Sequence, residues 1–385
     1  MDFAGALDPL QKYIAQRPDE PYPHFQLGYA YAGLNRLEDA KTEFSRAIAL
    51  DPKMAPAYQN LGLAVMDSDP AAAADAFRHA AELQPKESRP RFLAGFSLEQ
   101  AGKFPEAIEQ YRAALALSPA DYEAHFALGR VLLRANDAAG SEEQFRAALA
   151  TRADAAPARL GLGTALLAQS KFDAANDAFA DYLKLKPDDK AAHLDRASAL
   201  FHLSRYDDAL AELDRSDALG VPSAESLKMR GDIYMQQKEW KEAGEALKRA
   251  FLLAPQDADL AFRLGHTDIE LHDYAEAAQI LAQVYARNPQ DADVLRDLSE
   301  AFYLNGNYPE ALTAMDRLAK LEPPKPGSWF IRAICYDKLS RKAEAIEAYQ
   351  KFLDEYGGQN VDSQVLEARH RIAVLQRELA QSKKK

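Results

Sequence analysis

The 385-residue sequence has little cysteine, no long apolar run and no excess of positive charge. Cys335 is its only cysteine, which excludes an intrachain disulfide and a cysteine-ligated zinc site. No apolar stretch approaches the roughly 18 residues that a membrane-spanning helix needs. Lys and Arg number 47 against 59 Asp and Glu, and the resulting net charge of −12 disfavours general binding to a phosphate backbone.

Motifs for catalysis and metal binding are also missing. The sequence contains no Walker-type phosphate loop, no GxSxG elbow and no HExxH pair. Its histidines are scattered, and His266 and His272 are spaced so that they lie on different faces of a continuous helix. We therefore expect surface or groove histidines rather than metal ligands. The sequence predicts a protein that is not an enzyme and has no metal or cofactor.

What the sequence does contain is one unit that recurs along nearly the whole chain. Within residues 88–121 it predicts two short amphipathic helices, about Pro90–Gln100 and Pro105–Leu117. Pro119 ends the second helix, because proline disfavours helical geometry at the residue before it. The positions equivalent to Pro119 in the other repeats, with Pro119 itself, are residues 18, 52, 85, 119, 153, 187, 221, 255, 289, 323 and 357. Nine of the intervals between them are 34 residues long and one is 33. The short interval lies in the second repeat, where we expect the turn to absorb the lost residue.

Two positions of the repeat are small. The eighth is Gly, Ala or Ser throughout: Gly28, Gly62, Gly95, Gly129, Gly163, Ala197, Gly231, Gly265, Ser299 and Ala333. The twentieth is alanine except for Ser141: Ala40, Ala73, Ala107, Ala175, Ala209, Ala243, Ala277, Ala311 and Ala345. Small residues let neighbouring helix backbones approach closely, and large residues such as Phe44 and Phe77 fill the space between. One unit has too little apolar surface to fold alone, so stacking supplies the core.

A 34-residue helix–turn–helix with small residues at positions 8 and 20, an aromatic near 24 and a proline at 32 resembles the tetratricopeptide repeat (TPR). The resemblance covers ten consecutive repeats, residues 21–359, which would form one domain. It implies an all-α fold, an α-solenoid in which antiparallel helix pairs form a right-handed superhelix. It also implies that the first helices line a concave groove.

The segments outside the repeats are interpreted by the same register. Residues 1–20 are predicted to be half a repeat, a second helix alone. This half repeat is either an N-terminal cap or a truncated repeat of a longer protein, and we favour the second. Residues 360–382 are predicted to be a closing helix with Asp362 or Ser363 as N-cap, and 383–385 a basic tail. The apolar stripe of the closing helix consists of Val365, Ala368, Ile372, Leu375 and Leu379.

In this family, positions 5, 9, 12 and 13 of the first helix usually face the groove. The first six repeats contribute Phe25, Tyr29, Leu63, Met66, Phe92, Phe96, Phe126, Arg130, Leu133, Arg134, Leu160, Phe201 and His202. The last four contribute Lys228, Asp232, Gln236, Phe262, His266, Glu270, Arg296, Glu300, Tyr303, Phe330 and Lys338. The groove is thus predicted to be apolar and aromatic in its N-terminal half and mixed in charge in its C-terminal half.

The apolar half suggests a peptide site. We expect large side chains there to hold an extended or helical peptide, with Arg130 and Arg134 pairing with an acidic group on it. The alternative is that the aromatics at position 5 mostly pack against the next repeat and expose only their edges.

Four charged residues depart from the repeat pattern. Position 7, usually leucine, is Arg196, Arg230 and Arg332, and position 11, usually apolar, is Asp268. A carboxylate in a packing position is costly unless it is paired, and our hypothesis is that Arg230 pairs with Asp268. The alternative is a locally rotated helix that exposes Asp268. Cys335, at a packing position, is expected to be buried and inert.

The sequence therefore predicts an interaction scaffold that binds peptide segments or protein surfaces in its groove. The alternative is a TPR regulatory or targeting domain of a larger protein, such as an envelope-complex component or a TPR-bearing transferase. Only Asn60 and Arg89 match the residue set with which TPR domains clamp acidic chaperone tails, so that function is disfavoured. RNA binding is disfavoured by charge. Neither membrane insertion nor self-association is required by the sequence, and the compartment, cytoplasmic or periplasmic, stays open.

Overall fold

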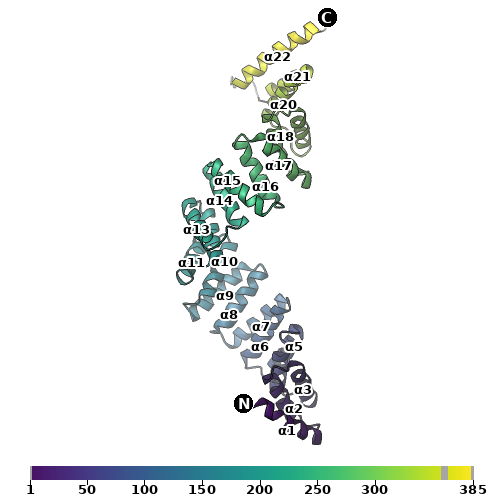
Figure 1. Cartoon of the computed structure of the whole chain (residues 1–385), viewed down its shortest axis with the longest axis vertical. Helices are drawn as coiled ribbons and strands as arrows, with labels where there is room; N and C mark the ends of the chain where they lie inside the picture. Colours follow the sequence, from purple (N-terminus) through teal and green to yellow (C-terminus); the bar gives the residue numbers. More distant parts are fainter. Residues whose placement is uncertain (1, 357–362, 383–385) are drawn as a thin grey trace. The chain divides into compact units, whose positions relative to one another are not determined.

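A computed structural model describes residues 2–356 and 363–382, and this part of the chain forms helices without a strand. The predicted all-helical repeat array is confirmed: pairs of helices follow one another along the chain, and each helix packs mainly on its neighbours in sequence (Figure 1). The chain divides into two compact units, Met1–Leu219 and Gly220–Lys385.

Unit 1 contains one helix from the segment predicted to be half a repeat, followed by six helix pairs. Its helices are α1 (Phe3–Gln16), α2 (Pro21–Gly33), α3 (Leu37–Leu50), α4 (Ala55–Val65), α5 (Pro70–Leu83), α6 (Ser88–Gln100), α7 (Phe104–Leu117), α8 (Tyr122–Arg134), α9 (Ala138–Thr151), α10 (Ala156–Ala168), α11 (Phe172–Leu185), α12 (Lys190–His202) and α13 (Tyr206–Ala218). Residues 1–20 thus contain one helix, and α6 and α7 lie where the sequence predicts them.

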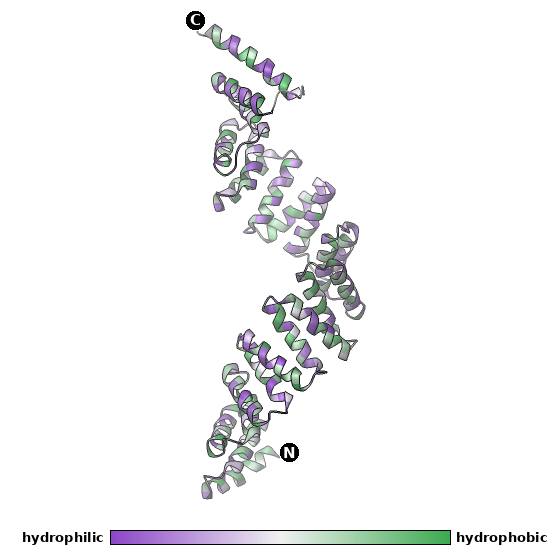
Figure 2. Cartoon of the chain, turned by 180° about the vertical axis from the view of Figure 1, so that it is seen from behind, coloured by the Kyte–Doolittle hydropathy of each residue, from purple (hydrophilic) through white to green (hydrophobic). Residues whose placement is uncertain are grey.

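Unit 2 contains the last four repeats and a final helix. Its helices are α14 (Ala224–Gln237), α15 (Trp240–Leu253), α16 (Ala258–Glu270), α17 (Tyr274–Arg287), α18 (Ala292–Leu304), α19 (Tyr308–Leu318), α20 (Pro326–Lys338), α21 (Lys342–Tyr356) and α22 (Ser363–Ser382). Hydrophobic and hydrophilic residues alternate along these helices, as expected when one face of a helix is buried (Figure 2). No described helix is long and apolar enough to cross a bilayer.

The small residue at position 8 is explained by the large residue at position 24. A Cβ atom added to Gly163 would lie 2.6 Å from the ring of Phe179, which is fully buried. Gly28 faces Phe44 in the same way, at 2.8 Å. The alanines at position 20 are also fully buried, and Ser141, the exception, donates a hydrogen bond of 2.7 Å to the carbonyl oxygen of Gly129. The two helices of a repeat therefore meet where the sequence predicts close approach.

Most turns between the two helices of a repeat contain one residue with positive φ. These residues are Asn35, Gly102, Asn136, Ser170, Ser204, Lys238, His272, Gly306 and Ser340. Among the described residues the second repeat has none, and its first helix, α4, has 11 residues against 13 in α2. The turn therefore absorbs the missing residue, as expected, and it is closed by the Asp69 N–H donating to the carbonyl oxygen of Val65 at 2.7 Å, as Arg36 donates to Tyr31 in the first repeat. Loss of one residue removes the left-handed turn position, so α4 ends early at Val65.

Position 4 of the first helix joins successive repeats in unit 1. His193 Nε2 lies 2.9 Å from the carbonyl oxygen of Pro187, and its Nδ1 lies 2.6 Å from Glu212 Oε2 on α13. We call this arrangement, in which position 4 contacts the carbonyl oxygen six residues earlier, a position-4 bridge. The other three are His24 to Pro18, His125 to Pro119 and Arg159 to Ala153. Three histidines thus hold neighbouring repeats together, and the expectation of surface or groove histidines is wrong for His24 and His193, which are buried.

The final helix packs on the last full repeat. Val365, Ala368 and Leu375 are buried in one cluster with residues of α20 and α21, and Ile372 packs against that cluster. Arg371 donates two hydrogen bonds of 2.8 Å to the carboxylate of Asp337. The predicted apolar stripe is the packed face of α22. Asp362, one of the two predicted N-caps, lies outside the described residues.

Candidate functional site

The candidate site is the surface formed by positions 5, 9, 12 and 13 of the first helices, which we call the first-helix face. These spacings place the four side chains on one side of a helix. In unit 1, Tyr29 and Leu63 at position 9 expose 45% and 49% of their surface. Phe25, Phe92 and Phe126 at position 5 are half-buried. Apolar groups on this face are thus accessible mainly at position 9.

The aromatics at position 5 pack within their own repeat. The ring centroids of Phe25 and Phe44 lie 5.9 Å apart, and those of Phe92 and Tyr111 lie 5.7 Å apart. The partner in each pair is the residue at position 24 of the same repeat. Position 5 therefore supports the core of its own repeat, and the buried clusters that Phe25, Phe92 and Phe126 pack against also include residues of the next repeat.

Arg130 and Arg134 share one buried carboxylate, Glu99, which is 4% exposed. Arg130 Nη2 lies 2.8 Å from Glu99 Oε2, and Arg134 Nη1 lies 3.4 Å from Oε1. The Tyr111 hydroxyl donates to the same carboxylate at 3.1 Å, and burial raises the pKa of Tyr111. Two cations and one anion leave a net positive charge, and the buried Arg130 Nε has no hydrogen-bond partner among the described residues.

The sequence-based interpretation missed Glu99 although it occupies position 12 of the third repeat. The pairing depends on a separation of 31 residues, which brings side chains on successive first helices together. The same separation joins Asp232 to Arg263 at 2.8 Å and His266 to Asp297 at 2.8 Å. Asp232 and His266, two of the charged residues predicted in the C-terminal half, are therefore paired with charged residues that the prediction did not include.

The environment of these pairs alters their proton affinity. Burial raises the pKa of Asp232 above its usual range, against the opposing effect of Arg263. The hydrogen bond that His266 donates to the Asp297 carboxylate raises the pKa of His266. Burial, with Asp297 and Glu270 nearby, also raises the pKa of Glu300. Acidic groups thus gather on the first-helix face of α16 and α18.

Other residues predicted on this face take different places. Met66, Phe96, Leu133, Leu160, Phe201 and Tyr303 are half-buried, and His202 is exposed and stacks on Phe172 with ring centroids 4.5 Å apart. Lys228 pairs with Asp257 and Asp259, and Arg296 pairs with Asp293 and Glu322. The assignment of Phe330 to the groove is wrong, because Phe330 is only 6% exposed and packs on Tyr349 and Phe352 in the core of the last repeat.

Asp268, the carboxylate in a packing position, is fully buried. The alternative interpretation, a rotated helix that exposes it, is therefore wrong. Lys248 Nζ lies 3.2 Å from Asp268 Oδ1, and burial raises the pKa of Asp268. Pairing with Arg230 stays a prediction. Of the other unusual arginines, Arg196 pairs with Glu212 and Arg332 with Asp316.

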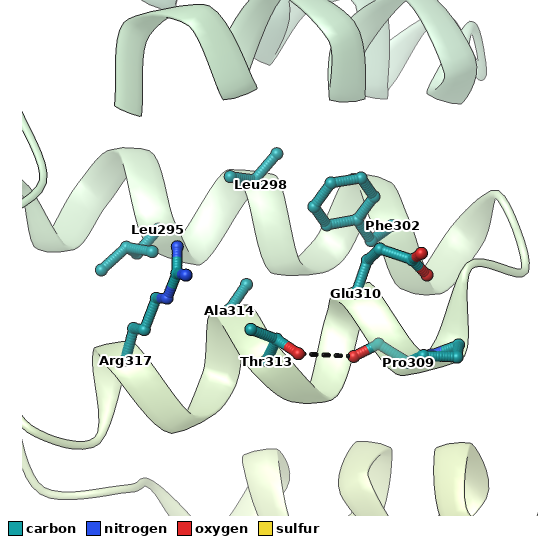
Figure 3. Close-up of a pocket in the computed structure, with 8 residues that line it drawn as sticks. All are labelled: Leu295, Leu298, Phe302, Pro309, Glu310, Thr313, Ala314 and Arg317. Atoms are coloured by element: carbon teal, nitrogen blue, oxygen red, sulfur yellow. Dashed lines mark hydrogen bonds between the residues drawn. The ribbon is translucent and has the colours of Figure 1, made fainter. Parts of the chain in front are cut away.

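Hollows on unit 2 flank α18 and α19. One, of about 270 Å³, is lined by Leu295, Leu298 and Phe302 of α18, with Glu310 and Arg317 of α19 at its two ends (Figure 3). Arg317 lies over the ring of Tyr285, 5.2 Å from its centroid, and Thr313 donates to the Pro309 carbonyl oxygen at 2.9 Å. A second hollow lies among α18, α19 and α20. In the part of the chain that the structure describes, no three His, Cys, Asp or Glu side chains are arranged to hold a metal.

Cys335 is fully buried, as expected, and burial raises the pKa of its thiol to about 11. We predict that the native thiol reacts slowly with a disulfide reagent at pH 8, because only about one thiol in a thousand is then ionised. In urea the reaction should be roughly a hundredfold faster or more, as the pKa returns to about 8.5. Equal rates with and without urea would mean that the thiol is accessible.

Comparison with known proteins gives one consistent family. Family models described as tetratricopeptide repeat match residues 92–157, 160–220 and 305–360, residues 268–327, and residues 21–54 and 224–257. A comparison with curated proteins gives no match.

Solved structures of other tetratricopeptide repeat proteins are similar to this chain at low sequence identity. A tetratricopeptide repeat protein from Parabacteroides merdae ATCC 43184 is 19% identical, with a TM-score of 0.44, over 64% of this chain and 98% of its own. YrrB, described as a TPR protein with an unusual peptide-binding site, is 21% identical, with a TM-score of 0.44, over 48% of this chain and 95% of its own. A thermophilic TPR protein from Thermus thermophilus, TTC0263, is 22% identical, with a TM-score of 0.36, over 47% of this chain and 99% of its own.

Proposed function

Because the chain belongs to the tetratricopeptide repeat family, whose members are generally protein-interaction scaffolds, we propose that it binds peptide segments or protein surfaces on the first-helix face of unit 1. The observation that supports this proposal is the arginine pair around Glu99. Arg130 and Arg134 expose 39% and 54% of their side chains beside half-buried aromatic rings. A ligand that combines an apolar side chain with a carboxylate matches both features.

The role of Glu99 in this site is to position the arginines. Its carboxylate anchors both guanidinium groups. The guanidinium carbon of Arg130 lies 5.9 Å from the centroid of the Phe126 ring. Each guanidinium has five N–H donors, and one carboxylate cannot accept all of them. The remaining donors and the uncompensated positive charge are available to an acidic ligand group.

The test is a selection with a phage-displayed library of random dodecapeptides against the full chain. Selected peptides should combine Asp or Glu with large apolar residues. An Arg130→Gln/Arg134→Gln/Glu99→Gln variant, which removes both arginines without leaving a buried carboxylate unpaired, should bind them at least roughly tenfold more weakly, since a charge-assisted hydrogen bond contributes about 1.5–3 kcal/mol.

The matched control replaces two exposed arginines of second helices, Arg112→Gln/Arg146→Gln, and should keep full affinity. Circular dichroism must show that all variants are folded. Selected peptides that lack acidic residues, or equal binding by the triple variant and the control, would refute the assigned role of the arginines.

A further inference from the structure

The junction between the last two full repeats is irregular. α19 ends at Leu318 after 11 residues, whereas the preceding second helix, α17, has 14. The longer connection Ala319–Lys325 then leads into α20, and its prolines at 323 and 324 keep it from continuing the helix. The regular turn that would place α20 against α19 is therefore absent, and a hollow remains between the two helices.

This hollow has a volume of about 290 Å³ and apolar walls. Its apolar lining comes from Met315, Leu318, Ala319, Pro323, Pro324 and Ile331. A space of this size with such walls accommodates one large aliphatic side chain. Gly327, in the first turn of α20, also lines it, and a Cβ atom added there would meet nothing within 4 Å.

A buried, incompletely bonded arginine lines the same hollow. Arg332 is 5% exposed, and one of its terminal nitrogens pairs with Asp316. Its Nε is buried and has no hydrogen-bond partner among the described residues. A buried N–H group without an acceptor is costly. Because Asp316 already balances the charge of Arg332, a neutral acceptor such as a peptide carbonyl oxygen fits this position best.

The charged rim of the hollow is acidic on the side of α18. Arg296 lines the rim but is engaged by Glu322 at 2.9 Å and by Asp293. Glu300 lines it too, and no ion pair is recorded for it among the described residues. Asp297 and Glu270 are near enough to raise the pKa of Glu300, and His266 opposes them only in part. Lys325, at the start of α20, also lines the hollow, so the acidic part of the rim is confined to Glu300 and its neighbours. A cation on the ligand would relieve this repulsion.

We propose that the hollow among α18, α19 and α20 is a second peptide site, which takes a large aliphatic side chain followed by lysine or arginine. The aliphatic side chain fills the apolar space. The peptide carbonyl oxygen accepts a hydrogen bond from Arg332 Nε, and the ligand cation lies beside Glu300. This site has the opposite charge preference to the face proposed for unit 1, and it stands or fails independently of that proposal.

The test uses three fluorescein-labelled octapeptides, acetylated and amidated at their ends, that differ only in two central residues. The central pairs are Leu-Lys, Leu-Glu and Ser-Lys, and binding to the full chain is followed by fluorescence anisotropy. The Leu-Lys peptide should bind at least roughly tenfold more tightly than either of the others, because burying one leucine side chain is worth about 1.5–3 kcal/mol. Equal binding of all three peptides, or no binding of any, would overturn the proposal.

Two variants separate the apolar and the charged contributions. Gly327→Leu fills the hollow from a position with open space and should weaken Leu-Lys binding at least roughly tenfold, whereas Gly327→Ala should not. Glu300→Gln should reduce the preference for Leu-Lys over Leu-Glu, and Glu245→Gln, an exposed acidic residue on α15, should leave it unchanged. Undiminished binding by a folded Gly327→Leu variant would place the peptide elsewhere.

Discussion

Replacing Phe179 with alanine should lower the free energy of unfolding of unit 1 by about 3–5 kcal/mol, the usual cost of deleting a buried phenylalanine ring. Phe179 is fully buried and packs against Gly163. Because glycine has no side chain, it cannot fill the space that the lost ring leaves. Urea unfolding followed by circular dichroism measures the loss. Because stacked repeats need not unfold in one step, amide hydrogen exchange in α10–α12 gives the local value.

Leu185→Ala on the same helix is the matched control for this prediction. Leu185 is 45% exposed, so its truncation should cost no more than about 0.5 kcal/mol. A loss below roughly 1 kcal/mol for Phe179→Ala would show that the close contact between positions 8 and 24 does not carry the stability of the repeat.

The complementarity of the two positions can be tested directly. Gly163→Ala places a Cβ atom 2.6 Å from the Phe179 ring and should destabilise by about 1–3 kcal/mol, offset in part by the better helix propensity of alanine. Adding Phe179→Leu should recover part of this loss, since the sixth repeat already combines Ala197 with Leu213, both fully buried. Simple additivity of the two changes would contradict the contact.

Replacing Asp268 with leucine should stabilise unit 2 by about 1–4 kcal/mol at pH 7, because a buried charge is often less favourable than a well-packed apolar residue. The repeats themselves support this change. Leu98, Leu132 and Leu166 occupy the same position in their repeats and are all nearly fully buried. Thermal and urea unfolding of the full chain measure the gain.

The gain should depend on pH in a defined direction. Burial raises the pKa of Asp268, so the folded state binds the proton more tightly than the unfolded state does. Ionisation of Asp268 therefore weakens the fold above its unfolded pKa of about 4, and this penalty fades as the pH falls through the folded pKa. The stability advantage of Asp268→Leu should accordingly shrink from pH 7 towards pH 4, and a constant advantage would argue against a titrating carboxylate.

Removing the cation instead tests which residue balances the charge. Lys248→Met should destabilise by about 2 kcal/mol, less than the 3–5 kcal/mol typical of breaking a fully buried pair, because Lys248 is 49% exposed. Arg230→Met tests the pairing expected from sequence. If both Arg230→Met and Lys248→Met lose their effect when Asp268→Leu is present, both cations act through this carboxylate.

The helices could be predicted from the sequence because their boundaries are set locally. Proline, turn residues and small residues act within one repeat, so the period alone places α6 and α7 within two residues. The pairing of Glu99 with Arg130 could not be predicted in this way, since it depends on how far one repeat advances over the next. The hollow beside Arg332 could not be predicted either, because it depends on where α19 ends. Pro323 keeps the usual spacing of the repeats, so the sequence does not indicate that α19 is short.

The position-4 bridges bear on how the repeats respond to force. In unit 1, His24, His125, Arg159 and His193 tie the end of one repeat to the start of the next through directed polar contacts. In unit 2 the same position is Leu227, Ala261, Leu295 and Trp329. Of these side chains only the indole of Trp329 has a hydrogen-bond donor. Hydrogen bonds are short-ranged, whereas apolar surfaces can slide over each other while remaining buried. Under a stretching load, the junctions that have a position-4 bridge should therefore resist separation of the end of one repeat from the start of the next more stiffly than the junctions without one.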